Sequence, residues 1–208
     1  MLETLQPQRF HVIVADCGTR FDAFSAKGET ARSPQKKYQT MTDAELTALP
    51  VADVAARNAF LFYWDTTARI AVGRHIPIMR AWGFEPTAFA FTWVKLLKRE
   101  DPSAPWFYPR GGVHCGTGFT TRKNTEVCIL GRRGSPRRRD ASVFEVIFSP
   151  RREHSRKPRE FYERVERYAS GPYLELFARE RRDGWTAWGD EIDKFTDRSR
   201  LPTRIAAE

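Results

Sequence analysis

The sequence predicts an α/β fold in which helices cover both faces of a mostly parallel β-sheet. Apolar runs of strand length alternate with runs of helical spacing along most of the 208 residues, as they do where helices connect parallel strands. The hydrophobic fraction of 41% and the aromatic fraction of 13% are those of a protein with a buried core. The first apolar run ends in an acid, Asp16, which is where open α/β folds place their chemistry.

Six runs have the length and composition of strands. The first, "FHVIVAD", is apolar and β-branched, and the second, "AFLFYWD", also closes on an acid. Neither run alternates polar with apolar residues, which is typical of strands buried on both faces. The six expected strands are residues 10–16, 59–65, 87–95, 125–131, 142–148 and 173–179.

Three segments have helical spacing. Thr42 followed by Glu45 forms the pattern of a capping box, which predicts a helix start there. A second helix is expected to end at Gly83, with a kink at Pro77. A third carries an apolar stripe and has Pro158 near its first turn. The three segments are residues 40–46, 67–84 and 155–168.

The organisation along the chain favours one domain with a short tail. Residues 25–37 are polar, and residues 99–124 form a long Pro- and Gly-rich connection of a kind that is often functional. The sequence shows no internal repeat. We therefore expect a single domain over residues 1–191 and a polar tail over residues 192–208.

The charge favours a polyanionic partner. The formal net charge is +9 and the isoelectric point is about 9.8. The run "RRGSPRRR" between two strands is either a solvated turn or a loop that contacts phosphates. It contains Arg132, Arg133, Arg137, Arg138 and Arg139.

Other composition features exclude several classes of protein. The three cysteines are scattered without CxxC spacing, which argues against a zinc site or a disulfide framework and fits a reducing cytoplasm. The four histidines show no metal-ligand spacing. The first ten residues lack the apolar core of a signal peptide, and no apolar run approaches the ~20 residues that span a bilayer.

The order of several motifs resembles one enzyme family. The motifs are "YQTMTDAEL", "FLFYW", "AWGF", "FTWVK", "GTGFTTRKNTEVCILGRRGSP", "REHSRKPREFYERVERY", "YLELFARERRDGW" and "WGDE", in that order after Asp16. Each motif is weak alone, but their order resembles the adenine N6-methyltransferases that include the catalytic subunit of the mRNA adenosine methyltransferase and many bacterial and phage DNA enzymes. The small size and Arg-rich loops are more similar to the bacterial and phage members.

This resemblance implies transfer of a methyl group from S-adenosylmethionine to an exocyclic amine, on a Rossmann-like sheet in circularly permuted order. The catalytic strand comes first and the cofactor strand last. The family's catalytic tetrapeptide "DPPW" would fall on Asp16, Cys17, Gly18 and Thr19. The resemblance also implies a nucleic-acid partner, DNA rather than RNA, and leaves open a homo- or hetero-oligomer.

The tetrapeptide is altered in a way that matters chemically. In the family motif, the Asp carboxylate and a backbone carbonyl accept hydrogen bonds from the adenine amine, and the aromatic residue stacks on the flipped base. Asp16 keeps the carboxylate, whereas Gly18 replaces a rigid proline and Thr19 has no aromatic face. Lost stacking alone is worth about 1–3 kcal/mol. A reduction in rate of roughly 10²-fold or more is therefore expected.

The resemblance assigns further residues to the cofactor and to the target base. Lys157 would lie beside the methionine carboxylate, Phe177 and Arg179 around the adenosine, and Asp190 and Glu191 on the ribose and adenine. The family usually has Asn at the place of Asp190. Positions that resemble the target pocket and its lid loops are Tyr38, Trp64, Lys95, Arg122, Asn124 and Glu126. Of these, Trp64 could equally be a core residue.

Three interpretations stay open at this point. The first is an active nucleic-acid methyltransferase with a degraded or re-purposed motif. The second is a catalytically silent member that binds nucleic acid or a partner subunit. The third is altered chemistry, in which Cys17 attacks a pyrimidine; a buried thiol is usually inert, however, and no proline precedes Cys17.

Overall fold

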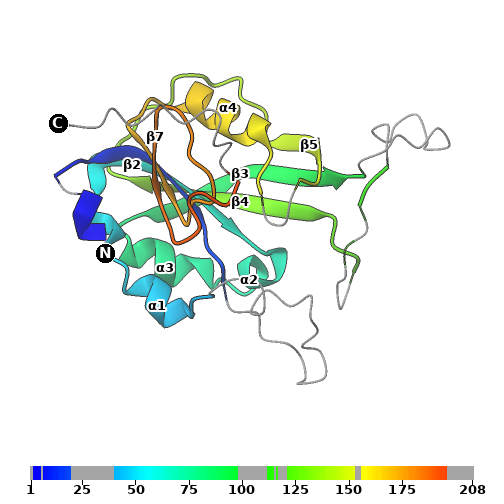
Figure 1. Cartoon of the computed structure of the whole chain (residues 1–208), viewed down its shortest axis with the longest axis horizontal. Coiled ribbons are helices and arrows are strands. Elements are labelled where there is room, and N and C mark those ends of the chain that lie inside the picture. Colours follow the sequence, from blue (N-terminus) through cyan, green and yellow to red (C-terminus); the bar gives the residue numbers. More distant parts are fainter. Residues whose placement is uncertain are drawn as a thin grey trace, which may run out of the picture.

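The computed structural model describes residues 2–5, 7–19, 40–97, 112–114, 116, 121–152 and 156–195. These residues form one seven-stranded sheet with the strand order β5-β3-β4-β2-β1-β6-β7. The chain enters the sheet near its middle, builds outward to β5, and then returns to the other side of β1 (Figure 1). The strands are β1 (Phe10–Asp16), β2 (Ala55–Asp65), β3 (Glu85–Leu96), β4 (Thr125–Arg133), β5 (Val146–Pro150), β6 (Tyr173–Leu176) and β7 (Trp185–Trp188).

Strand direction defines two opposite edges of the sheet, at which the strands begin or end. β1 is parallel to β2 and β6, β6 to β7, and β3 to β5, whereas β4 is antiparallel to both of its neighbours. The expected mostly parallel α/β sheet is therefore confirmed. We call the edge where β1, β2 and β6 end, at Asp16, Asp65 and Leu176, the carboxyl edge. The opposite edge, where these strands begin and β4 ends, is the amino edge.

Helices cover both faces of the sheet, as the sequence predicts. One face is covered by α1 (Asp43–Thr47), α2 (Thr67–Ala71) and α3 (His75–Ala81), which lie below the strands in the view of Figure 1. The other face is covered by α4 (Arg159–Tyr168), which lies above them. β1 supplies Ile13 to the apolar cluster on the α1–α3 face and Val14 to the cluster on the α4 face. Burial on both sides explains why this strand has no polar alternation.

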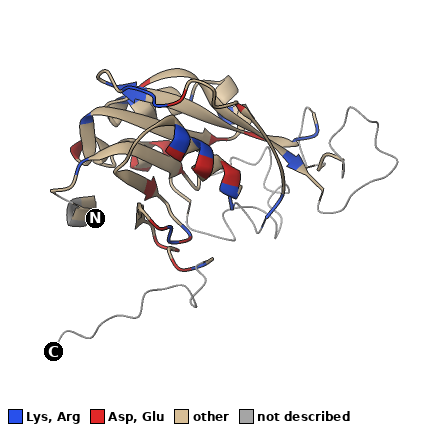
Figure 2. Ribbon diagram, turned by 90° about the horizontal axis from the view of Figure 1, so that it is seen from above, with Lys and Arg blue, Asp and Glu red and all other residues tan. Residues whose placement is uncertain are grey.

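Charged residues on α4 point away from the sheet. Phe161, Tyr162 and Val165 are buried against it, and the exposed side of the helix alternates basic and acidic positions (Figure 2). Two short 3₁₀ segments, Leu2–Leu5 and Val51–Asp53, complete the described elements.

The structure confirms one helix signal and corrects another. Thr42 forms the expected capping box, since its hydroxyl accepts from Glu45 N at 3.2 Å while Glu45 Oε2 accepts from Thr42 N at 2.7 Å. The single helix expected over residues 67–84 is wrong, because the chain breaks at Gly73, where φ is +71°. Pro77 causes no kink: it is the third residue of α3, where a backbone N–H has no partner within the helix.

Strand ends also differ from the expectation. β6 stops at Leu176 because Phe177 adopts φ 61°, which is left-handed and cannot continue a strand. β5 begins later than expected, at Val146, and β7 has no counterpart among the six expected strands. No helix among the described residues is long and apolar enough to cross a bilayer. The domain boundary at residue 191 stays a prediction.

Candidate active site

A small cavity opens at the carboxyl edge where the chain order reverses. β1 lies between β2, which is the next strand along the chain, and β6, which comes much later. The ends of β1 and β6 therefore flank the point where open α/β sheets bind ligands. Asp16 comes from the end of β1 and Glu175 from β6. The cavity is lined by Asp16, Arg156, Lys157, Tyr162, Glu175, Phe177, Arg179, Glu180 and Phe195.

Lys157 is the central cation of this cavity. It precedes α4 and keeps only 5% of its side chain exposed. Its Nζ lies 2.6 Å from Asp16 Oδ2 and 3.1 Å from Glu126 Oε2, and 5.1 Å from the centre of the Trp64 ring. A buried ammonium is tolerated only when it is paired in this way.

The cluster continues through Glu126 to Lys95. Lys95 Nζ lies 2.5 Å from Glu126 Oε1, so that two lysines share one carboxylate. Burial raises the pKa of Glu126, but the ammonium groups of Lys157 and Lys95 outweigh it and lower that pKa to about 2. For Lys157, burial alone would lower the pKa, whereas Asp16 and Glu126 raise it above the usual range. Glu126 and Lys157 are therefore ionised at neutral pH.

Backbone hydrogen bonds fix the turn after Asp16. Thr19 N donates to the Cys17 carbonyl at 2.8 Å, and Met41 N donates to the Gly18 carbonyl at 2.9 Å. The bridge between Thr19 and Met41 ties this turn to the residue before the cap of α1. These bonds partly replace the rigidity that the prolines of the family motif would supply, and each carbonyl retains a second lone pair.

Cys17 is poorly suited to nucleophilic attack. Its side chain packs against the apolar cluster on the α1–α3 face. Burial raises the pKa of its thiol well above the usual value, and the nearby Asp16 carboxylate adds to that effect. Because the thiolate is the nucleophilic form, this environment disfavours the attack on a pyrimidine.

Glu175 is a second buried carboxyl group in the cavity. Tyr162 Oη donates to Glu175 Oε1 at 2.7 Å, and Oε2 is buried without a hydrogen-bond partner within the described part of the chain. Burial raises the pKa of Glu175 to about 7, although the bond from Tyr162 opposes the shift. Sequence reasoning missed this pair, because nothing in "YLELFAR" marks its acid as buried.

The residues expected at the cofactor meet at this cavity. Lys157, Phe177 and Arg179 all line it. Arg179 Nε lies 3.3 Å from Glu191 Oε2, which brings the "WGDE" segment against the "ELFAR" segment. Asp190 is exposed next to Glu191. The left-handed backbone at Phe177 turns its ring against Trp188, with ring centres 5.6 Å apart.

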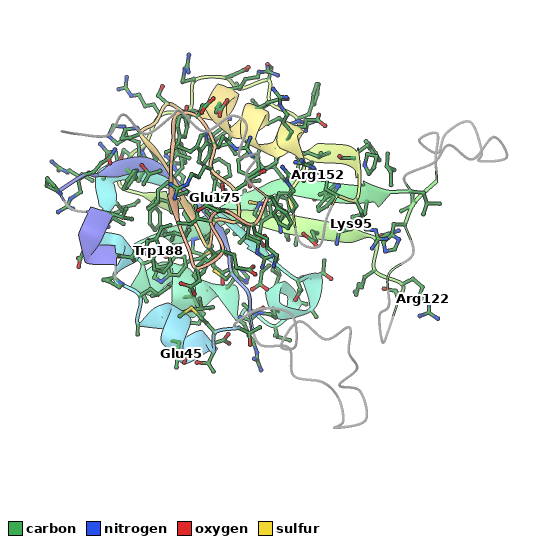
Figure 3. All side chains as sticks on the ribbon, in the orientation of Figure 1. Glu45, Lys95, Arg122, Arg152, Glu175 and Trp188 are labelled. Carbon is green, nitrogen blue, oxygen red and sulfur yellow. The ribbon has the colours of Figure 1, made fainter. Side chains whose placement is uncertain are left out.

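The residues expected at the target base are only partly gathered. Lys95 and Glu126 join the Lys157 cluster. Trp64 is buried in the cluster on the α4 face with 2% exposure, and Lys157 Nζ lies over its ring. Arg122 and Asn124 are exposed and precede β4. The Asn124 carbonyl accepts from Lys95 N at 2.9 Å, which places Asn124 beside Lys95. Arg122 lies far from Glu175 in Figure 3. Tyr38 lies outside the described residues.

The Arg-rich loop lies at the other edge of the sheet. β4 runs opposite to β2, so the residues that follow it emerge at the amino edge. Arg132, Arg137, Arg138 and Arg139 are therefore not brought together with Asp16, and their contact with phosphate stays a prediction. Arg133 has a structural contact there, since its Nη1 donates to the Ala52 carbonyl at 2.8 Å.

A further ionic network supports the carboxyl edge. Arg69 Nε lies 3.0 Å from Asp65 Oδ1, and Arg69 Nη2 lies 2.6 Å from Asp43 Oδ1. Burial raises the pKa of Asp65, and Arg69 opposes the shift. The network joins the end of β2 to α1 and α2. The acid that closes the second apolar run was the only sequence signal for it.

Comparison with known proteins identifies the family. The family model described as MT-A70 matches residues 10–191. The chain belongs to the MT-A70 family. The match starts at the first residue of β1 and includes every described strand, and it agrees with the resemblance drawn from the motifs.

Named relatives of this family cover much of the chain. It is 31% identical over 159 residues to "Type II methyltransferase M.MunI" of Mycoplasma sp, covering 75% of this chain and 60% of that protein. It is 29% identical over 177 residues to "N6-methyladenosine RNA methyltransferase MTA1" of Cryphonectria parasitica, covering 80% and 48%. It is 28% identical over 177 residues to "N(6)-adenine-specific methyltransferase METTL4" of Homo sapiens, covering 76% and 34%. The matches thus span from about a third to three fifths of these relatives.

Proposed function

We propose that this protein transfers a methyl group from S-adenosylmethionine to the N6 amine of adenine in nucleic acid, with DNA as the preferred substrate. The observation that carries the proposal is the ion pair of Asp16 with buried Lys157, in a cavity at the switch point of the sheet. Membership of the MT-A70 family and the names of the relatives support the choice of adenine. The Arg-rich loop, which resembles those of the bacterial and phage DNA enzymes, supports DNA.

The residues of the cavity fit S-adenosylmethionine. An ammonium has three N–H donors, and Lys157 directs two of them at Asp16 and Glu126, which leaves one for a ligand carboxylate. The buried Oε2 of Glu175, which has no partner in the described part of the chain, offers an acceptor for an amino group. Phe177 would contact the adenosine ring, and Arg179 with Glu191 its ribose side. When bound, this cofactor supplies an electrophilic methyl group.

Asp16 orients the target amine. The lone pair of an adenine amine is delocalised into the ring, so the amine must be held by hydrogen bonds that localise that pair on nitrogen. Lys157 contacts Asp16 Oδ2, and Oδ1 is the oxygen that accepts an N–H from the amine. The carbonyl of Cys17 or Gly18 accepts the second N–H with its remaining lone pair. The Asp16 carboxylate is also the acceptor at hand for the proton that the amine loses.

The altered motif predicts slow rather than absent transfer. The hydrogen-bonded turn preserves the position of both carbonyls, whereas Thr19 supplies no aromatic surface for the base. The missing stack is worth about 1–3 kcal/mol, which corresponds to roughly five- to 150-fold in rate.

The test is transfer of labelled methyl groups to DNA and RNA of matched sequence, with the product nucleosides identified by mass spectrometry. N6-methyladenine in DNA is the expected product. Methylated RNA alone would contradict the DNA preference, and a methylated pyrimidine would support the altered chemistry at Cys17. Cofactor and nucleic-acid binding without any product would support the silent-partner interpretation instead.

A further inference from the structure

We propose that the amino edge of the sheet is a second nucleic-acid-binding surface, which holds the phosphate backbone roughly five nucleotides away from Asp16. This inference extends the proposed function, but it can be tested without methyl transfer. It starts from a cavity of about 390 Å³ at this edge. Four segments converge there: the starts of β1 and β2, the loop after β4, and the residues after α4.

The lining of this cavity has the chemistry of a phosphate site. Arg57 and Arg137 supply cations, and His11, Ser135 and Ser170 supply polar groups. Asn58 Oδ1 accepts from Ser135 N at 2.9 Å, which fixes the amide so that its NH₂ group remains a donor. The floor is apolar, with Phe60 only 3% exposed. Guanidinium groups around such a floor match a sugar–phosphate chain better than an apolar ligand.

The arginines here differ in their pairing from the buried and half-buried cations near Asp16 and Asp65. There, Lys157, Lys95 and Arg69 each lie within 4 Å of a carboxylate. At the amino edge, by contrast, lie four arginines that we call the amino-edge arginines: Arg57, Arg132, Arg137 and Arg138. Among the residues that the structure describes, none of these four forms an ion pair with an acid. A group of cations without counter-charges favours a polyanion.

The loop that presents these arginines is held in place. Gly134, at φ +62°, turns the chain directly after β4, and an added Cβ there would lie 2.4 Å from Asn58 Oδ1. Arg139 N donates to the Tyr168 carbonyl at 2.7 Å, which attaches the loop to the end of α4. A preorganised loop loses little conformational entropy when it binds. These contacts therefore favour the phosphate-binding interpretation over a solvated turn.

The distance between the two edges sets the geometry of the complex. His11 lines the cavity and Asp16 ends the same strand, five residues further along β1, which at about 3.3 Å per residue gives roughly 17 Å. A nucleic-acid strand advances about 3.4 Å per nucleotide, so this separation corresponds to roughly five nucleotides. The amino-edge arginines would therefore bind backbone well outside the target base, and contribute affinity rather than sequence specificity.

The experiment compares two triple variants with the same change in net charge. The test variant is Arg57→Gln, Arg137→Gln and Arg138→Gln. The control variant replaces with Gln three exposed arginines that already pair with acids: Arg80 with Glu85, Arg159 with Glu163, and Arg181 with Asp193. Fluorescence anisotropy of a labelled duplex of about 30 base pairs, longer than the edge separation, gives the dependence of affinity on salt.

The test variant should reduce the salt slope by about two to three, because each phosphate that the protein no longer neutralises lowers the slope by roughly 0.9. The control variant should reduce it by less than about one. Equal slopes for the two variants, or a test variant equal to wild type, would overturn the proposal. The proposal would also be overturned if the test variant bound the duplex as wild type does but no longer bound vesicles of anionic lipid. A duplex-binding protein with the expected slopes but no methylated product would contradict only the proposed function.

Discussion

Replacing Lys157 with Met tests whether the buried ion cluster organises the active site. The substitution keeps most of the length of the side chain and removes its charge, so Asp16 and Glu126 lose the cation between them. Removing one partner of a buried pair costs about 3–5 kcal/mol. Asp16 and Glu126 keep 23% and 27% of their side chains exposed, so water recovers part of that loss. We expect a decrease of about 2–3 kcal/mol in the free energy of unfolding at neutral pH.

Urea denaturation of Lys157→Met, Glu126→Gln and the double variant measures this cost and its origin. The coupling between the two sites should be at least about 1 kcal/mol. The effect should depend on pH, because the pKa of Glu126 is lowered from 4.5 to about 2 in the fold. A lowered pKa stabilises the fold above pH 4.5, and that stabilisation is lost as the pH falls towards 2. The loss caused by Lys157→Met should therefore shrink in acid.

The matched control is Lys194→Met, which removes an exposed lysine from its pair with Glu191. It should change the free energy of unfolding by no more than about 0.5 kcal/mol. If Lys157→Met costs no more than this control, or costs the same with and without Glu126, the cluster does not have the role assigned to it.

Two other changes test the altered motif and the second buried acid. Restoring the motif with Cys17→Pro, Gly18→Pro and Thr19→Trp together should raise the rate of adenine methylation at least about tenfold, because the stack alone is worth about 1–3 kcal/mol. If the wild-type protein methylates adenine rapidly and the triple variant is no faster, the account of the motif is wrong. The free energy of unfolding of the wild-type protein should fall by about 3 kcal/mol as the pH rises from 4.5 to above 7, since burial raises the pKa of the Glu175 carboxyl to about 7. Glu175→Gln should abolish this fall. Urea midpoints across this pH range measure the difference, and parallel curves for the two proteins would refute the shifted pKa.

Local sequence patterns predicted the parts of the fold that depend on burial and on capping. The β-branched run of β1 predicted a strand because both of its faces are buried, and Thr42 predicted the start of α1 because its capping partner lies three residues away. The place of Lys157 in the same site as Asp16 followed from the motif resemblance rather than from the residues themselves. The structure adds that Lys157 also pairs with Glu126, on a strand far along the chain.

Features that depend on pairing between distant parts of the chain could not be predicted from local sequence patterns. The reversal of β4 between two parallel strands sends the Arg-rich loop to the amino edge, and nothing within "TEVCILG" encodes that direction. The buried state of Glu175 depends on Tyr162 from another element. The break at Gly73 was missed because the apolar spacing continues through it from α2 into α3.

The central claim is that Asp16 orients an adenine amine for methylation beside a bound cofactor. Asp16→Asn tests it most directly, because it keeps the size of the side chain and its Lys157-facing oxygen while removing the charge. Two quantities are measured on the same preparation: N6-methyladenine formed in DNA, by mass spectrometry, and affinity for S-adenosylhomocysteine, by calorimetry. The account predicts that the variant loses the product but still binds S-adenosylhomocysteine. Methyl transfer to adenine at the wild-type rate in Asp16→Asn would contradict it.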